Sequence, residues 1–333
     1  MKLFFRQNRR LALAWPALAA IIFIANPFPA VLAQSAWPAR PVKIVVPFAP
    51  GGTTDILARA MAPELSKAFG QPFVVENRAG AGGNIGADVV AKAAPDGYTM
   101  LLCVNSYTIN TSLYRNLGWD LLRDFAPVGR YVTSPMLVVV NDKLPVKSLR
   151  ELVDFARANP GKLNFGSAGN GTAPHLVGEQ FALLTGLTMT HVPYKGSAPS
   201  VTGLLGDEVQ LSFAASSSVD AFVKDGRLKS LAVTTAARDP QYPNLPTIAE
   251  AGVPGFDADI WYGLVVPAKT PTAIVKKMSD DLGRVMADPD TQARLRQHGL
   301  NPAYLPSEAM GELMRRDVAR WKDLAAKIRL TLE

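Results

Sequence analysis

Short apolar runs alternate with amphipathic helical patterns along most of this chain, and this alternation limits the possible folds more than any other feature. Residues 42–46 form a β-branched apolar run between two prolines, which is typical of a buried strand. Further strands are predicted at residues 73–75, 99–104, 137–140, 163–165, 188–192, 209–213 and 230–234. Such alternation predicts an α/β fold whose mostly parallel sheets are covered by helices on both faces.

The predicted helices begin at recognisable caps. The cap types at residues 53–55, Ser148 and Thr172 each precede a helix, Thr270 caps a helix with Pro271 at its first position, and a last helix covers residues 307–329. Ser148 and Glu151 form a capping box, whereas Pro63 interrupts the first helix and predicts a kink or break. With 333 residues and neither a repeat nor a long linker, the chain fits two α/β lobes joined by crossovers within the sheets.

Composition excludes several classes of site. The single cysteine, Cys103, rules out a disulfide framework and a cysteine-based metal centre. The three histidines are far apart in sequence, so neither a metal site nor a cofactor is expected. The net charge of +7 comes largely from the first residues, and without residues 1–33 the excess of basic residues falls to three. Because no basic stripe remains, nucleic-acid binding is not expected.

The amino terminus has the pattern of an export signal. Lys2, Arg6, Arg9 and Arg10 precede an apolar run over residues 11–25, and small residues lead to Ala33. This order predicts a signal peptide covering residues 1–33 and cleaved after Ala33, which places the mature protein in the periplasm. An uncleaved membrane anchor is the alternative, and the export route, general or twin-arginine, is left open.

Three glycine-containing loops join a predicted strand to a predicted helix: residues 47–55, 166–172 and 193–197. Glycine lets backbone N–H groups approach a ligand closely, and a helix N-terminus favours an anion. Each loop alone is equally typical of a tight turn. Their equivalent positions at the ends of strands favour a shared anion site, because ligands of α/β sheets bind there.

Enzyme motifs do not fit. The segment around Ser167 lacks the first glycine of a nucleophile elbow, and the glycines at residues 80–83 do not match a dinucleotide fingerprint. The acidic pair Asp280 and Asp281 falls on a helix and is predicted to face solvent. We therefore expect a binding protein and no enzyme. The alternative is an enzyme of similar architecture that uses His175 or Tyr194.

Several segments together resemble the Bug family, the extracytoplasmic substrate-binding proteins of tripartite tricarboxylate transporters. They are residues 37–55, 76–84, 95–99, 166–176, 191–196, 245–252 and 261–264. The resemblance covers nearly all of residues 37–333. It implies a two-lobed periplasmic binding protein fold of type II, in which the lobes close around a small carboxylate and membrane permease subunits receive it. A role in sensing or in a degradation pathway is the further alternative.

The resemblance also implies lobe boundaries and site residues. Lobe 1 is expected at residues 34–104 and 234–333, and lobe 2 at residues 105–233, in a monomer with the ligand cleft between the lobes. The candidate ligand-binding residues are Phe48, Ala49, Pro50, Gly51, Gly52, Thr53, Asp55, Asn105, Ser106, Ser167, Ala168, Gly169, Asn170, Gly171, Thr172, His175, Tyr194, Lys195 and Gly196. For Asp55, His175 and Lys195, a structural role or exposure to solvent is the competing interpretation.

One departure from the family pattern bears on specificity. Where many relatives carry an acidic or amide side chain soon after Phe213, this chain has Ala214, Ala215 and three serines. If these residues line the distal end of the pocket, the pocket is less acidic and suits an uncharged or aromatic tail.

Overall fold

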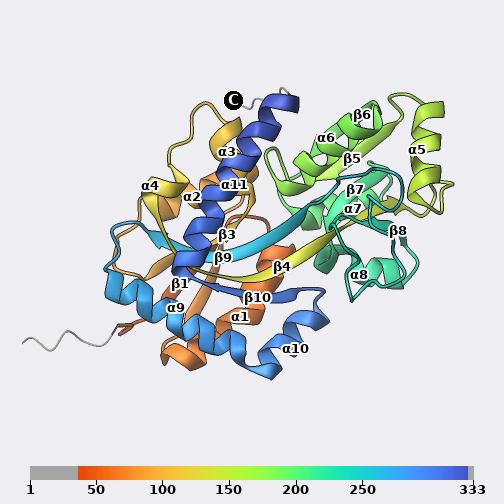
Figure 1. Ribbon diagram of the computed structural model, residues 1–333. Helices are drawn as coiled ribbons and strands as arrows, with labels where there is room; N and C mark the ends of the chain where they lie inside the picture. Colours follow the sequence, from red (N-terminus) through yellow and green to blue (C-terminus); the bar gives the residue numbers. More distant parts are fainter. Residues whose placement is uncertain (1–36, 329–333) are drawn as a thin grey trace, which may run out of the picture. The chain divides into compact units, whose positions relative to one another are not determined.

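A mixed β-sheet runs through the computed structural model, which describes residues 37–328 (Figure 1). The strands follow one another in the order β2-β1-β3-β9-β4-β7-β5-β6, and β8 and β10 also pair with β4. Their bounds are β1 Val42–Val46, β2 Phe73–Asn77, β3 Thr99–Val104, β4 Phe125–Asn141, β5 Leu163–Ser167, β6 Met189–Pro193, β7 Leu211–Ala215, β8 Leu228–Val233, β9 Asp259–Pro267 and β10 Asn301–Pro306. All the predicted strands are confirmed. The predicted signal peptide lies outside the described residues.

The outer strands are parallel and the middle of the sheet is antiparallel. β1 pairs in parallel with β2 and β3, and β5 pairs in parallel with β6 and β7. In contrast, β9 is antiparallel to β3 and β4, and β4 is antiparallel to β7, β8 and β10. Local sequence patterns predicted mostly parallel sheets because βαβ units dominate the outer regions. The middle consists of antiparallel pairs between strands far apart in sequence, such as β3 with β9 and β4 with β7, for which local patterns carry no signal.

The 17-residue strand β4 links two groups of strands. Its first part pairs with β9 and β10, up to Pro135 opposite Asp259, and its second part pairs with β7 and β8 from Met136 onward. Thr234 stands beside this junction, where its N–H donates to the Met136 carbonyl (3.0 Å) and its hydroxyl donates to the Ala258 carbonyl (2.6 Å). We call residues 37–134 and 259–328 the first half, and residues 135–258 the second half.

This pairing bears on the expected lobe boundaries. Residues 105–134, which the sequence assigned to lobe 2, contact first-half elements: α3 packs on α11, and the first part of β4 pairs with β9. In this structure residues 105–134 lie with the first half, and where lobe 2 begins stays a prediction. The return near residues 233–235 coincides with Thr234. The division into two moving lobes stays a prediction.

Helices cover the sheet and begin close to the predicted positions. Their bounds are α1 Thr53–Phe69, α2 Asn84–Ala91, α3 Ser106–Leu113, α4 Leu121–Asp124, α5 Leu149–Ala158, α6 Ala173–Thr185, α7 Ser197–Leu205, α8 Ser216–Lys224, α9 Thr272–Ala287, α10 Pro289–Gln297 and α11 Ser307–Ile328. The side chain of Ser148 accepts the Glu151 N–H (3.2 Å), which confirms the predicted cap of α5. Pro63 lies inside α1, which continues to Phe69, so no break occurs there.

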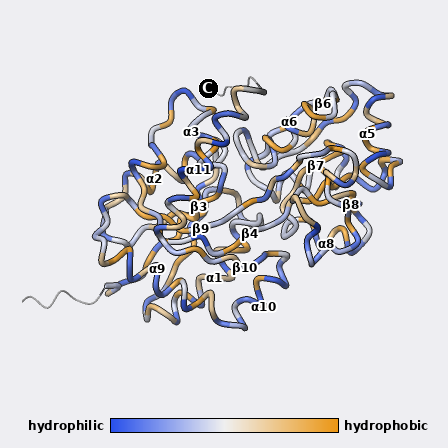
Figure 2. Tube along the Cα trace, viewed as in Figure 1, coloured by the Kyte–Doolittle hydropathy of each residue, from blue (hydrophilic) through white to orange (hydrophobic). Residues whose placement is uncertain are grey.

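The core follows the strands. Ile44, Leu101, Val138, Phe213 and Val265 come from five strands and are fully buried. Hydrophobic residues gather along the central strands in Figure 2, whereas hydrophilic ones mark outer helices such as α10. Burial of this apolar surface, at about 25 cal/mol per Å², is the main term that stabilises the fold. None of the described helices is both long and apolar enough to cross a bilayer.

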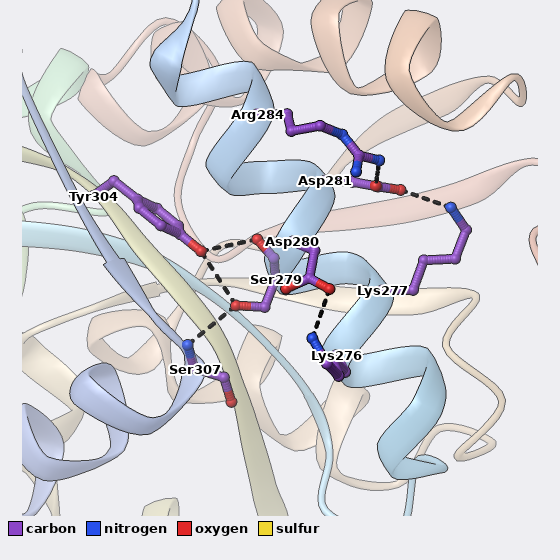
Figure 3. A network of polar contacts seen from close by, with 8 residues as sticks. All are labelled: Lys276, Lys277, Ser279, Asp280, Asp281, Arg284, Tyr304 and Ser307. Carbon is purple, nitrogen blue, oxygen red and sulfur yellow. Dashed lines mark hydrogen bonds and ion pairs between the residues drawn. The ribbon is translucent and has the colours of Figure 1, made fainter.

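One sequence prediction about the acidic pair on α9 is wrong. Asp280 is exposed beside Lys276 (2.8 Å), but Asp281 is only 1% exposed and forms ion pairs with Lys277 (2.8 Å) and Arg284 (Figure 3). Adjacent helix positions differ by about 100° in direction, so one carboxylate faces solvent while the other turns inward. Figure 3 also shows Tyr304 donating its hydroxyl hydrogen to the Ser279 carbonyl (2.9 Å), which ties α9 to β10.

Candidate functional site

A small cavity lies where the first and second halves meet. First-half residues on its wall come from the loop after β1, the end of β3 and the start of β9, and second-half residues come from the loops after β5, β6 and β7. The lining residues are Phe48, Thr53, Thr54, Val104, Ser106, Ala168, Thr172, Ala173, Pro174, Ser197, Ala215, Ile260 and Tyr262. The cavity volume is about 30 Å³, enough for roughly two waters or one carboxylate group.

Five helices begin at this cavity. α1, α3, α6, α7 and α8 each contribute to its wall an N-cap residue or one of the first two helical residues. In all five, no side chain caps the helix, whereas Asp120, Ser148 and Asp288 cap α4, α5 and α10. Backbone N–H groups in the first turn have no partner within the helix, so these termini present partial positive charge to a ligand. The arrangement suits an anion.

The side chains on the wall are uncharged. Hydroxyl groups come from threonine, serine and tyrosine, and no lining residue is acidic, basic or histidine. Burial raises the pKa of the Tyr262 hydroxyl, which is therefore neutral at physiological pH. An anion in this cavity would be held by helix N-termini and hydroxyl hydrogens, without a neutralising lysine or arginine.

Asp55 shapes the first loop from inside and does not line the cavity. Its carboxylate accepts hydrogen bonds from the Gly51 N–H, Arg59 Nε and Asn77 Nδ2, each at 3.0 Å. Burial alone would raise the pKa of Asp55, but these hydrogen bonds outweigh it, so the pKa lies below its ordinary value. These contacts therefore support a structural role for Asp55, in which its carboxylate holds the first loop.

The second loop, residues 166–172, is held by its own side chains. Thr172 donates its hydroxyl hydrogen to the Gly169 carbonyl (2.7 Å), and the Gly171 N–H donates to Nδ1 of His175 (3.1 Å). Gly169 and Gly171 have φ angles of +133° and +73°, which L-residues with a Cβ rarely adopt. The loop therefore turns sharply enough to place Ala168 and Thr172 on the cavity wall.

The structure brings part of the predicted set to the cavity. Phe48, Thr53, Ser106, Ala168 and Thr172 line it. The other predicted residues shape the same loops or point elsewhere: Ala49, Pro50, Gly51, Gly52, Asp55, Asn105, Ser167, Gly169, Asn170, Gly171, His175, Tyr194, Lys195 and Gly196.

Ser197 of the third loop lines the cavity, and contacts within this loop explain why Tyr194 and Lys195 do not. The Ala49 N–H donates to the Lys195 carbonyl (3.3 Å), which joins the first loop to the third. Tyr194 donates its hydroxyl hydrogen to Glu208 (2.9 Å), and the Lys195 side chain is exposed. Neither side chain lines the cavity, so we find no contact that supports Tyr194 or Lys195 as a ligand group.

The set of candidate residues left out eight lining residues: Thr54, Val104, Ala173, Pro174, Ser197, Ala215, Ile260 and Tyr262. Of these, Thr54 and Ser197 lie in the predicted loops, and Ala215 was considered only for the distal end of the pocket. The positions at helix starts had a signal, because residues in the first turn after a glycine loop face the same edge of the sheet. Ile260 and Tyr262 had none, since β9 reaches the cavity only by pairing with β3 and β4, far away in sequence.

The structure also reveals an unpredicted contact between Ser167 and His191. The Ser167 hydroxyl lies 2.6 Å from Nε2 of His191, whose ring stacks between those of Phe165 and His175. A serine and a histidine at this distance suggest a nucleophile and its base. However, Ser167 is fully buried and absent from the cavity wall, and no carboxylate among residues 37–328 is bonded to His191. The contact orders the second loop.

The half-buried His191 predicts a pH dependence of stability. Burial, with a smaller contribution from His175, lowers the pKa of His191 to about 3, against about 6.5 in an unfolded chain. Below pH 6.5 the unfolded state binds a proton at this histidine that the folded state does not bind. The folded state therefore becomes less stable relative to the unfolded state as pH falls from 6.5 toward 3. Between pH 6.5 and 4.5 we expect the free energy of unfolding to fall by about 2 kcal/mol from this group.

Urea unfolding at several pH values measures the effect. In His191→Gln the dependence between pH 6.5 and 4.5 should be weaker by that amount. His298→Gln, a change at an exposed histidine, should keep the dependence of the unchanged protein. Equal pH dependence in the unchanged protein and His191→Gln would show that His191 is not held neutral.

Comparison with known proteins gives consistent matches over most of the chain. The family model described as "Tripartite tricarboxylate transporter family receptor" matches residues 57–330. Protein BugT of Bordetella pertussis is 35% identical over 303 residues, which cover 90% of this chain and 93% of that protein.

Two solved structures are similar throughout. The R. palustris protein Rpa4515 with adipate is 38% identical, with a TM-score of 0.86, over 89% of this chain and 99% of that one. MatC from Rhodopseudomonas palustris with bound malate is 31% identical, with a TM-score of 0.81, over 86% of this chain and 99% of that one. The predicted fold and the resemblance stated from the sequence are confirmed.

Proposed function

This chain belongs to the receptor family of tripartite tricarboxylate transporters, and from that premise we propose that it captures a small carboxylate at the cavity between its halves. The observation that carries the proposal is the group of five helix N-termini without side-chain caps around a wall that has no charged side chain. Such termini bind anions, and a carboxylate accepts several N–H groups at once. The adipate and malate in the two similar structures support this class of ligand.

The part of the ligand beyond its carboxylate belongs in a neighbouring cavity. Ala168, Pro174 and Ser197 line both cavities, and the second adds Ala214, Ser218 and Ser200, among others. This wall is apolar or carries hydroxyl groups, and it has no acidic side chain. The absence of acidic groups favours the hypothesis of an uncharged tail and argues against a ligand with a distal amine. The cavity volume of about 10 Å³ holds about one water, so a longer or aromatic tail fits only if the wall moves.

Ligand capture requires the halves to move. The two cavities have volumes of only about 30 and 10 Å³, and the hydrogen bond from the Ala49 N–H to the Lys195 carbonyl joins a loop of the first half to a loop of the second. We therefore interpret the arrangement as a closed state and place the hinge at residues 134–136 of β4, Thr234 and Ala258. A ligand that contacts both halves stabilises the closed state through contacts that only this state provides.

Small-angle X-ray scattering with and without ligand tests this motion. The radius of gyration should fall when the protein is saturated with its carboxylate. An unchanged radius of gyration at saturation would contradict closure on the ligand.

The first experiment on function is a thermal-shift screen. We expect an aliphatic or aromatic carboxylate to raise Tm by about 5 °C at a concentration of about 100 times its Kd. The matching primary amide, which has the same shape without the charge, should leave Tm unchanged. The function proposed here fails if amides and carboxylates stabilise the protein equally, or if no carboxylate stabilises it.

The finer assignments follow from the receptor role. We propose that residues 1–33 direct export and are removed after Ala33, that the protein acts in the periplasm as a monomer, and that permease subunits of a tripartite transporter receive its ligand. We further propose that it has no catalytic activity. The supporting contact is the inward orientation of His175, whose Nδ1 accepts the Gly171 N–H (3.1 Å) away from the cavity wall.

A further inference from the structure

A third, larger cavity, separate from the two described above, lies between helix α11, the start of β9 and strand β4. Its volume is about 410 Å³, within the range of small-molecule sites. Five charged side chains line it: Arg130, Asp259, Arg316, Asp317 and Arg320. Asn105 also lines this cavity, whereas its neighbour Ser106 lines the first, so the two cavities are separate but adjacent in the chain.

The charges in this cavity are not paired with one another. Among residues 37–328, no ion pair joins any of the three arginines to either aspartate. Arg130 donates from Nε to the Ala303 carbonyl (2.9 Å), and Arg320 donates from Nη2 to the Asp257 carbonyl (2.9 Å). A guanidinium has five N–H donors in a fork that fits a carboxylate, so each retains donors that can bind one.

The two aspartates differ in their surroundings. Asp317 is 7% exposed and accepts the indole N–H of Trp261 at 2.7 Å, so part of its hydrogen-bonding capacity is used. The Asp259 side chain is exposed at the cavity, and its backbone carbonyl accepts a bond from Asn105 Nδ2 (2.9 Å). Desolvation raises the pKa of Asp317, although the Trp261 hydrogen bond and the three arginines act to lower it. Desolvation, and then the nearby Asp257 and Asp317, raise the pKa of Asp259, which means that the arginines do not fully compensate the charge.

An occupant of this cavity has to satisfy both signs of charge. A plain dicarboxylate would meet the arginines but would be repelled by Asp259, and a plain amine would meet the aspartates but be repelled by three guanidiniums. We propose that this cavity binds a small zwitterion with a carboxylate and an ammonium group, such as a free α-amino acid. The carboxylate is bound by Arg316 and Arg320 beside Arg130, and the ammonium group is bound by Asp259.

The indole of Trp261 offers a direct readout. Its N–H is bonded to Asp317 inside the cavity, so its ¹H–¹⁵N signal changes when the cavity is filled. We titrate the whole protein with single common L-α-amino acids. At least one should shift this signal saturably with a Kd below about 1 mM, and its N-acetyl derivative and its amide should bind at least about tenfold more weakly.

Variants at exposed positions in the middle of α11 test the assignment without affecting the core. Arg316→Gln and Arg320→Gln should each weaken binding by about tenfold or more. The matched control Arg315→Gln changes an exposed arginine of the same helix that does not line the cavity, and it should bind as the unchanged protein does. Asp259→Asn should remove the preference for the amino acid over its N-acetyl derivative.

A further control tests whether the amino acid binds in this cavity or in the carboxylate cavity described first. Gly52→Leu adds a side chain at the loops of the first cavity, and the amino acid should still shift the Trp261 signal in this variant. The proposal is overturned if no amino acid shifts the signal up to about 10 mM. It is also overturned if N-acetyl derivatives bind equally well, if Arg315→Gln weakens binding as much as Arg316→Gln, or if the shift disappears in Gly52→Leu.

Discussion

Replacing Gly52 with leucine lowers the affinity for the carboxylate ligand by about 100-fold or more, while the free protein stays folded. Gly52 has φ −84° and ψ 172°, which any L-residue adopts, so the substitution does not strain the backbone. A Cβ at this position lies 3.5 Å from the Ala198 nitrogen and 3.5 Å from the Ser197 Cβ, an ordinary contact. The remaining carbons of leucine would overlap α7, so the halves cannot close.

Side-chain size is the control in this experiment. Gly52→Ala, whose single methyl group fits, should bind within about threefold of the unchanged protein, and Gly52→Val should be intermediate. Isothermal titration calorimetry measures the affinities, and the Tm of the free protein checks the fold. If Gly52→Leu binds as tightly as Gly52→Ala, ligand capture does not require the closed contact between the first loop and α7.

Replacing Gly82 with alanine lowers the affinity by about tenfold or more through a different contact. Gly82 lies in the first half, and a Cβ there would lie 2.2 Å from the carbonyl oxygen of Asn170 in the second loop. A backbone oxygen cannot move aside as a flexible side chain does. The added methyl group therefore keeps the second loop away from the first half and destabilises the closed state.

Two controls isolate this clash. Gly82 has a φ of +63°, so alanine there also costs about 1 kcal/mol of backbone strain. Gly161→Ala has the same cost at φ +72°, but its methyl group meets nothing within 4 Å, and it should leave affinity unchanged. Tyr114→Phe removes only the hydroxyl that donates to the Asn170 carbonyl (3.2 Å) and should have a smaller effect than Gly82→Ala. If Gly82→Ala and Gly161→Ala lower the affinity equally, the cause is backbone strain and not the contact with the Asn170 carbonyl.

Local patterns predicted the elements well, because each has a local cause. The apolar run at β1 and the cap at Ser148 depend on residues within a few positions, and the structure has both. The three glycine loops were also placed correctly between a strand and a helix. Their glycines are needed for turns with positive φ, as at Gly169 and Gly171, and this requirement can be read from the sequence.

The cavity wall could be predicted only in part, because it depends on pairing between distant segments. Tyr262 reaches the cavity because β9 lies antiparallel to β3, and no spacing within residues 259–267 indicates that partner. The contact of Ser167 with His191 depends on the parallel register of β5 and β6. Similarly, the course of the 17-residue strand β4 through both halves results from its pairing with β9 and then with β7, which lie far away in sequence.

A crystal structure of the protein with its best carboxylate ligand tests most directly whether helix N-termini bind the ligand. In the predicted complex, the carboxylate oxygens lie within about 3.2 Å of backbone N–H groups in the first turns of helices from both halves. They also accept hydrogen bonds from hydroxyls such as Thr53 or Ser197, and they contact no lysine or arginine. A carboxylate bound by a basic side chain, or bound outside this cavity, would contradict the account.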